Sequence, residues 1–105
     1  MTFNYIVLMD WAGVELYIDQ DRDTGLKNKA IFDALYSQKD SIEKDFGDSL
    51  EWDRLDDKRA SRIRKRFTNG GLALPDSWPA LQNWMIDTMI RFERVIRPRL
   101  QKIET

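Results

Sequence analysis

The chain has 105 residues, the usual size of one domain, so we expect a single domain over residues 1–105 whose core needs no disulfide or structural metal. Its 17 Lys and Arg residues against 18 Asp and Glu residues give a net charge of −1, which excludes a global field that would draw it to nucleic acid or an anionic membrane. The absence of cysteine and histidine excludes thiolate nucleophiles, imidazole acid–base chemistry and the usual zinc ligands.

The first predicted elements are two short strands that form a hairpin. Tyr5 to Met9 and Val14 to Ile18 are rich in β-branched and aromatic residues, and a four-residue connection separates them. In the second run apolar residues alternate with Glu15 and Tyr17, so one face should lie on a core. The first run is much shorter than a signal-peptide core or a membrane span and has no basic leader, which favours a cytoplasmic protein.

A long helix is predicted next. The polar connector Asp19 to Gly25 precedes it, and Asp23 or Thr24 would cap its first turn. Apolar residues at three- and four-residue spacing predict one helix over about Leu26 to Phe46. Gly47 stands where a left-handed C-cap is required.

The middle of the chain predicts a second hairpin. Leu50 to Leu55 and Ser61 to Phe67 both alternate apolar and charged residues, and Asp56 to Ala60 would form the loop. A register that places Trp52 beside Ile63 also sets two acidic residues opposite two arginines. The competing interpretation is a helix that begins at residue 56 or 57, because Lys, Arg and Ala favour helices.

The last predicted elements are a loop and a helix. Thr68 to Ser77 contains two glycines and a proline and is typical of a loop. From Trp78 an apolar stripe predicts a helix, which should end or kink near Arg97 because Pro98 follows. The stripe consists of Leu81, Met85, Met89, Phe92 and Ile96. The order ββαββα predicts a two-layer α+β domain, with two helices packed on one face of an antiparallel sheet.

A basic segment gives one candidate binding surface. Residues 58–75 carry six basic side chains and no acidic one, and three of them alternate along the predicted strand. Alternate residues project from one face at intervals of roughly 6.8 Å, close to the step between phosphates of a nucleic-acid strand. The candidate anion or nucleic-acid site comprises Lys58, Arg59, Arg62, Arg64 and Arg66. The alternative is a self-neutralised surface, in which Glu51 and Asp53 of the partner strand pair with the arginines.

The four tryptophans give a second candidate surface. Trp52 and Trp78 fall on apolar faces and are predicted to be core residues. Trp11, in the hairpin turn, and Trp84, off the main stripe of its helix, are predicted to be exposed and to anchor a protein partner or a second copy of the chain. An open sheet edge would offer the same kind of partner unpaired backbone groups.

A catalytic interpretation rests on one short motif. Asp56-Asp57-Lys58 resembles the acid-x-Lys element of Mg²⁺-dependent nucleases, and a further acidic ligand would have to come from Asp10, Glu15 or Asp53. A turn rich in Asp and Lys is ordinary hairpin chemistry. We therefore expect no catalytic residue, no metal site and no cofactor, and a nuclease is only a distant third hypothesis.

Four segments in order give the chain a family resemblance. They resemble an uncharacterised prokaryotic domain of unknown function that commonly forms the C-terminal part of proteins with a predicted restriction-nuclease-like region. The segments are VELYID (14–19), NKAIFDALYSQKDSIEKDFG (28–47), LEWDRLDDKRASRI (50–63) and WMIDTMIRFERVIRPRL (84–100). The resemblance implies an accessory module in a DNA-processing or defence-related system, with a nuclease-like region fused or encoded nearby.

Taken together, the sequence predicts a binding or interaction module without enzymatic activity. The first hypothesis is phosphate or nucleic-acid contact through the basic hairpin. The alternative is a protein–protein or homo-oligomerisation module that does not bind nucleic acid.

Overall fold

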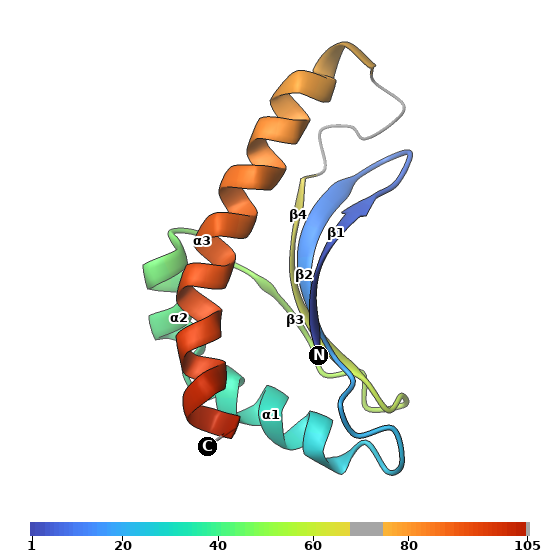
Figure 1. Cartoon of the computed structure of the whole chain (residues 1–105), viewed down its shortest axis with the longest axis vertical. Coiled ribbons are helices and arrows are strands. Elements are labelled where there is room, and N and C mark those ends of the chain that lie inside the picture. Colours follow the sequence, from blue (N-terminus) through green and yellow to red (C-terminus); the bar gives the residue numbers. More distant parts are fainter. Residues whose placement is uncertain (68–74, 105) are drawn as a thin grey trace.

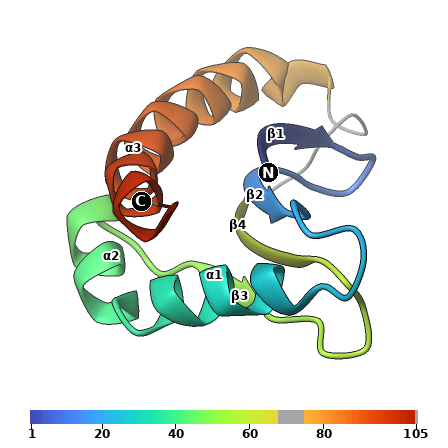
Figure 2. The same ribbon diagram turned by 60° about the horizontal axis from the view of Figure 1, so that its bottom comes forward.

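A computed structural model of the chain describes residues 1–67 and 75–104 (Figure 1). The strands are β1 (Thr2–Val7), β2 (Ala12–Ile18), β3 (Glu51–Asp53) and β4 (Ser61–Phe67), and the helices are α1 (Leu26–Tyr36), α2 (Lys39–Phe46) and α3 (Trp78–Glu104), preceded by a short 3₁₀ turn (Pro75–Ser77). The four strands form one antiparallel sheet in the order β1-β2-β4-β3. The three helices cover one face of it (Figure 2), so the predicted α+β class is confirmed.

The core lies between the sheet and the helices. Val14 and Leu16 of β2 and Ile63 of β4 are fully buried and point toward the helices, as their alternation predicts. On α3 the predicted apolar stripe is confirmed, because all five of its residues are buried. The ring of Phe92 packs edge-to-face against Phe3 of β1 and Phe46 of α2, so it joins one edge of the sheet to the helical layer.

The prediction of a single helix over residues 26–46 was wrong. The helix is divided at Ser37 and Gln38, where the hydroxyl of Ser37 donates to the carbonyl oxygen of Ala34 at 2.7 Å. A serine hydroxyl competes in this way for carbonyl groups that would continue the helix. The break lets Leu35 of α1 and Ile42 of α2 both point into the core, and Gly47 forms the predicted left-handed C-cap with φ of 95°.

Of the two outcomes predicted near Arg97, an end of the helix is wrong, because α3 runs through Pro98 to Glu104. The proline is exposed, and the Arg99 guanidinium donates to the carbonyl oxygen of Val95 at 2.8 Å beside it. Leu100 is buried and Ile103 packs against the core, so burial of the last turns outweighs the interruption that a proline causes.

Two side chains of the connector before α1, those of Asp21 and Thr24, bond to the first turn of the helix. The backbone N–H of Lys27 donates to Asp21, and with the N–H of Asp23 and the Thr24 hydroxyl it lowers the pKa of this carboxyl to about 2. The N–H of Leu26 donates to the hydroxyl of Thr24. The N-cap residue of α1 is therefore Gly25, with a φ of 77°, and not Asp23 or Thr24 as predicted. Thr24 and Asp21 instead accept hydrogen bonds from N–H groups of the first turn. None of the described helices is both long and apolar enough to cross a membrane.

Candidate functional site

The face of the sheet opposite the helices, here called the outer face, carries the predicted basic hairpin. The β3–β4 register pairs Trp52 with Ile63, Glu51 with Arg64 and Asp53 with Arg62, so the predicted hairpin and register are confirmed and the competing helix is not formed. Loop residues 68–74, predicted to follow, lie outside the described residues. The outer face is formed by Glu15, Tyr17, Glu51, Asp53, Arg62, Arg64 and Arg66.

Each of the three hairpin arginines on the outer face lies beside a carboxylate. Arg62 Nε donates to Asp53 at 2.8 Å, and Arg66 makes two parallel hydrogen bonds to Glu51, both at 2.7 Å. Arg64 lies between these pairs, with its Nε 3.5 Å from Glu51 and 3.7 Å from Asp53. The hydrogen bonds that Arg66 donates to Glu51 raise the pKa of its guanidinium. This arrangement is the self-neutralised surface that the sequence offered as the alternative.

Trp11 completes the outer face instead of projecting into solvent. The guanidinium carbons of Arg64 and Arg66 lie 5.3 Å and 5.4 Å from the centre of its ring, within cation–π range. The strands approach closely here, since a Cβ on Gly13 would lie 2.5 Å from the carbonyl oxygen of Lys65. The predicted exposed anchor Trp11 is thus half-buried under two arginines.

The other two predicted basic residues lie in the β3–β4 loop. The Arg59 guanidinium makes two hydrogen bonds of 2.8 Å to Asp19, which lower the pKa of that carboxyl. Lys58 is exposed and forms no ion pair with any described residue. Across residues 1–67 and 75–104 no group of three metal-binding side chains comes together, and Arg54 pairs with Asp56 of the acid-x-Lys motif.

The same loop is fixed by Lys29, which the sequence did not single out. Its ammonium group reaches from α1 and donates to the carbonyl oxygens of Arg54, Leu55 (2.8 Å) and Ala60 (2.6 Å) and to the Ser61 hydroxyl (3.0 Å). Leu55 has a φ of 57°, which is disfavoured for leucine. These contacts make Lys29 a structural residue, because its donor groups are used by the loop.

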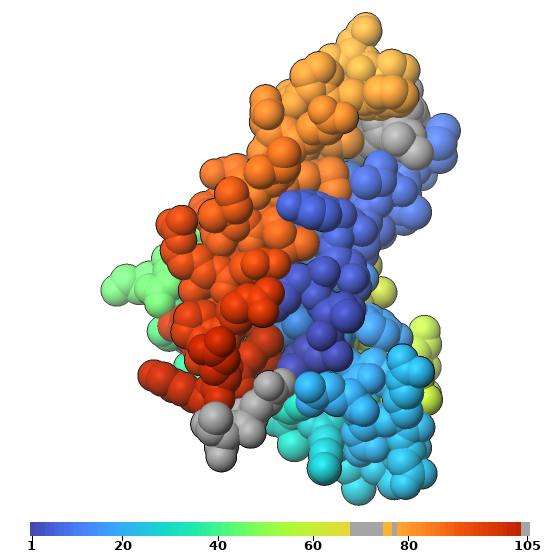
Figure 3. Space-filling model, in the orientation of Figure 1, coloured from blue at the N-terminus to red at the C-terminus, as the bar shows by residue number. Residues whose placement is uncertain are grey.

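A second surface lies along the opposite edge of the sheet. Its members, here called the β1–α3 strip, are large apolar side chains that are close to half exposed: Tyr5 (53 %) and Val7 (43 %) on β1, and Ile86 (54 %) and Ile90 (52 %) on α3. Arg97 lies over the ring of Phe3 at 4.8 Å, which places this flank of the helix beside β1. Figure 3 shows β1 and α3 side by side at the surface.

The remaining tryptophans also depart from prediction. Trp84 was expected to be exposed, but its ring packs 5.1 Å from that of Phe67 in a small cluster with Leu81 and Met85. Trp78 was expected in the core and is 41 % exposed. The helical stripe alone placed both residues wrongly, because it does not show that Phe67 of β4 lies beside Trp84.

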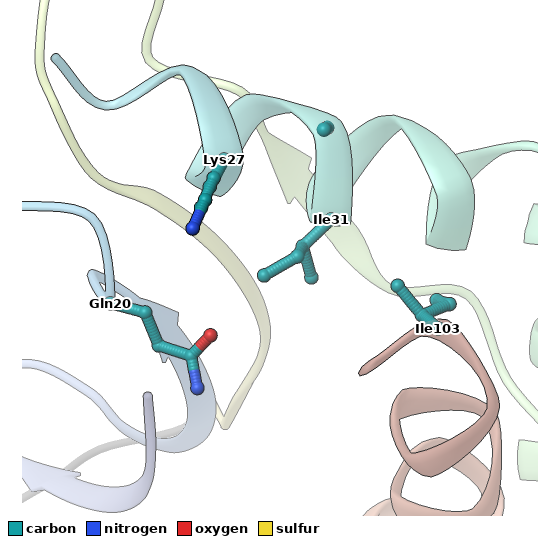
Figure 4. Close-up of a pocket in the computed structure, with 5 residues that line it drawn as sticks. Gln20, Lys27, Ile31 and Ile103 are labelled. Atoms are coloured by element: carbon teal, nitrogen blue, oxygen red, sulfur yellow. The ribbon is translucent and has the colours of Figure 1, made fainter. Parts of the chain in front are cut away.

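The pocket of about 530 Å³ in Figure 4 lies between the connector, α1 and the end of α3. Gln20, Lys27, Ala30, Ile31 and Ile103 line it, and Gln20 and Lys27 lie across the pocket from Ile103. A single amine opposite aliphatic groups gives no pair of groups for acid–base or nucleophilic chemistry.

Comparison with known proteins gives a family and no activity. No curated protein and no solved structure matches the chain. A family model described as "Domain of unknown function (DUF4268)" matches residues 1–100. The chain therefore belongs to this family of domains of unknown function.

Proposed function

We propose that this chain is a non-catalytic protein-interaction module that binds its partner through the β1–α3 strip. The observation that carries the proposal is the open β1 edge: six residues long, without a charged side chain, and flanked by exposed isoleucines of α3. Unguarded edge strands pair readily with another chain, and exposed apolar patches favour the same contact. The setting we propose is a prokaryotic, cytoplasmic DNA-processing or defence system with a nuclease-like region fused or encoded nearby, as the resemblance implies.

The basic hairpin gives weaker support to nucleic-acid binding. A phosphate would have to displace Glu51 or Asp53 from arginines that already make hydrogen bonds of 2.7 to 2.8 Å. Among the five candidate residues, only Lys58 has no ion-pair partner in the described part of the chain, and one contact gives little affinity. The nuclease hypothesis has no support in the described geometry, because no carboxylate cluster stands at Asp56 to Lys58.

The proposal is tested by comparing two single substitutions at separate surfaces. Immobilised wild-type chain, exposed to an extract of its source cells, should retain a defined protein, its own chain included. Val7→Lys should lose that protein, because it places a charge in the strip. Arg64→Ala, on the outer face, should retain it. Retention that survives Val7→Lys and disappears with Arg64→Ala would contradict the proposal.

Nucleic-acid binding is tested directly by titrating labelled single-stranded DNA at about 50 mM salt, where phosphate contacts are strong. The wild type should not bind. Glu51→Gln combined with Asp53→Asn should create binding, because it exposes three arginines. For this variant, a plot of the logarithm of the binding constant against that of the salt concentration should have a slope of roughly −2 to −3. Each of three phosphate contacts contributes about 0.7 to 0.9 to this slope. Salt-dependent binding by the wild type would replace the protein-binding proposal with the nucleic-acid one.

A further inference from the structure

We propose that the partner on the β1–α3 strip is a second copy of this chain, with the two β1 strands paired antiparallel about a twofold axis at Tyr5. This inference rests on the proposed function and names its partner. The resulting dimer would join the two four-stranded sheets into one continuous sheet, with the two α3 helices on the same face. Twofold dimers are the commonest assemblies of identical chains.

The hairpin geometry shows which backbone groups of β1 are available. The N–H of Leu8 donates to the carbonyl oxygen of Trp11 at 2.9 Å, and the β1–β2 register continues from this pair. In an antiparallel ladder hydrogen-bonded pairs alternate with non-bonded ones, so even-numbered residues of β1 bond to β2. The N–H and C=O groups of Phe3, Tyr5 and Val7 therefore point to the open edge.

A twofold pairing must match both these backbone groups and the faces of the sheet. Directly opposite residues point to the same face, so an odd residue must face an odd residue. Centring the pair on Tyr5 satisfies this condition with three hydrogen-bonded pairs inside the strand: Phe3 with Val7, Tyr5 with Tyr5, and Val7 with Phe3. Centring the pair on Asn4 leaves only two hydrogen-bonded pairs inside the strand. The Tyr5 register also forms aromatic and aromatic–aliphatic pairs, which stabilise sheets.

The side chains around the strand favour a copy of the same chain. Residues 1–9 carry no acidic or basic side chain, so the dyad brings no like charges together. Above the paired strands, Ile86 and Ile90 of each α3 lie on the flank that faces the open edge. The dyad would therefore set the apolar flank of one α3 toward that of the other. One surface would be self-complementary in both backbone and side chains.

The first experiment measures the mass of the chain by sedimentation equilibrium from about 1 to about 200 µM, a range that covers weak and moderate dissociation constants. The wild-type mass should rise from 12.5 kDa toward twice that value. Tyr5→Pro should remain monomeric, since its lost N–H points away from β2 and proline is tolerated on such an edge. Thr2→Lys, at the end of the same strand, is the matched control and should dimerise.

The second experiment tests the register by disulfide cross-linking. The chain contains no cysteine of its own, so a cross-link can form only through the introduced residue. Under mild oxidation Tyr5→Cys should form a covalent dimer, since paired Cα atoms about 5.5 Å apart lie within disulfide range. Val7→Cys should not, because the two Val7 positions would lie four residues apart, roughly 13 Å along the strands. A circular dichroism spectrum like that of the wild type confirms that each variant is folded.

The outcomes separate this inference from the proposed function. A wild type that stays monomeric throughout, while Val7→Lys still abolishes capture of another protein, overturns the second copy and leaves protein binding intact. A dimer that persists in Tyr5→Pro, or that cross-links through Val7→Cys instead of Tyr5→Cys, overturns the β1 pairing. Failure of both capture and self-association overturns the proposed function itself.

Discussion

The two edges of the sheet are built in opposite ways. β3 has three residues, two of them acidic, and both carboxylates pair with arginines of β4. β1 has six residues and no charge, and Tyr5 and Val7 are close to half exposed. Short length and charge are the usual means by which natural sheets prevent edge pairing. The β3 edge has both features and the β1 edge has neither.

This difference explains how the basic hairpin is used. The arginines of β4 form ion pairs with the edge strand beside them. Under the proposed function, this run of basic residues therefore protects one edge of the sheet. At the β1 edge, no ion pair among the described residues gives the same protection. An extended surface without charge is costly to leave in water, which is the physical reason to look for a partner there.

The largest expected effect comes from Phe92→Ala, at the core residue that joins the β1 edge to α2. Phe92 is fully buried and contacts Phe3 and Phe46, so its loss should lower the free energy of unfolding by about 3 to 5 kcal/mol. Urea denaturation measures the change. Ile90→Ala, on the exposed flank of the same helix, is the control and should change monomer stability by less than about 0.5 kcal/mol.

Hydrogen exchange in the Phe92→Ala variant then tests whether the two edges share one core. If they do, amides of β1 and of β3 should both lose protection. Faster exchange confined to β1 would show that the two edges of the sheet unfold as independent units.

A smaller effect is expected from Lys29→Met, which acts on the β3 side alone. The substitution removes the ammonium group from three carbonyl oxygens, including that of Leu55 with its unfavourable φ. We expect a loss of about 2 to 3 kcal/mol, because the loop carbonyls lose their partner. Lys27→Met, an exposed residue two positions earlier, should leave stability nearly unchanged.

The Lys29→Met variant should still dimerise with the wild-type dependence on concentration, because β1 lies at the far edge of the sheet. A loss of dimerisation would mean that the β3–β4 loop controls the geometry of β1. The two edges would then be coupled rather than independent.

Much of the β3 edge could be predicted from local sequence, whereas the β1 edge could not. Alternation around Trp52 and Ile63 defined the register and thereby the carboxylate partners of Arg62 and Arg64. Burial of Tyr5 or Ile90 depends instead on where α3 crosses the sheet, which no local pattern records. The absence of charge over residues 1–9 was the available signal, and it becomes informative only once β1 is known to be an edge.

Two further departures concern the ends of helices. The period of apolar residues continues through residues 36–38, so it does not reveal that Ser37 ends α1. A proline normally marks a helix end, but burial of Leu100 carries α3 past Pro98. A local hydrogen bond of Ser37 decided the first case, and the tertiary burial of Leu100 decided the second.

The smallest expected effect is a pH dependence confined to the β3 edge. Glu43 of α2 accepts hydrogen bonds from the Leu50 N–H (2.7 Å) and the Trp52 indole N–H (3.1 Å), and so fixes the start of β3. Burial alone would raise the pKa of Glu43, but these bonds and that from Lys39 outweigh it and lower the pKa below 4.5. The stabilisation is therefore present above about pH 4.5 and is lost as the pH falls through the folded-state value.

Glu43→Gln should accordingly lower the free energy of unfolding by about 1 kcal/mol at pH 7. The loss is partial because the amide replaces some of the hydrogen bonding that the carboxylate provides. The difference from wild type should shrink as the pH falls below about 4.5, because the protonated carboxyl and the amide become equivalent partners. Urea denaturation at several pH values measures it, and the NMR signal of the Trp52 indole N–H reports on the bond itself. Asp23→Asn, an exposed substitution in the connector, should show no such convergence. A difference that stays constant down to pH 3 would mean that Glu43 acts by packing, and β3 would then be held by its arginine pairs alone.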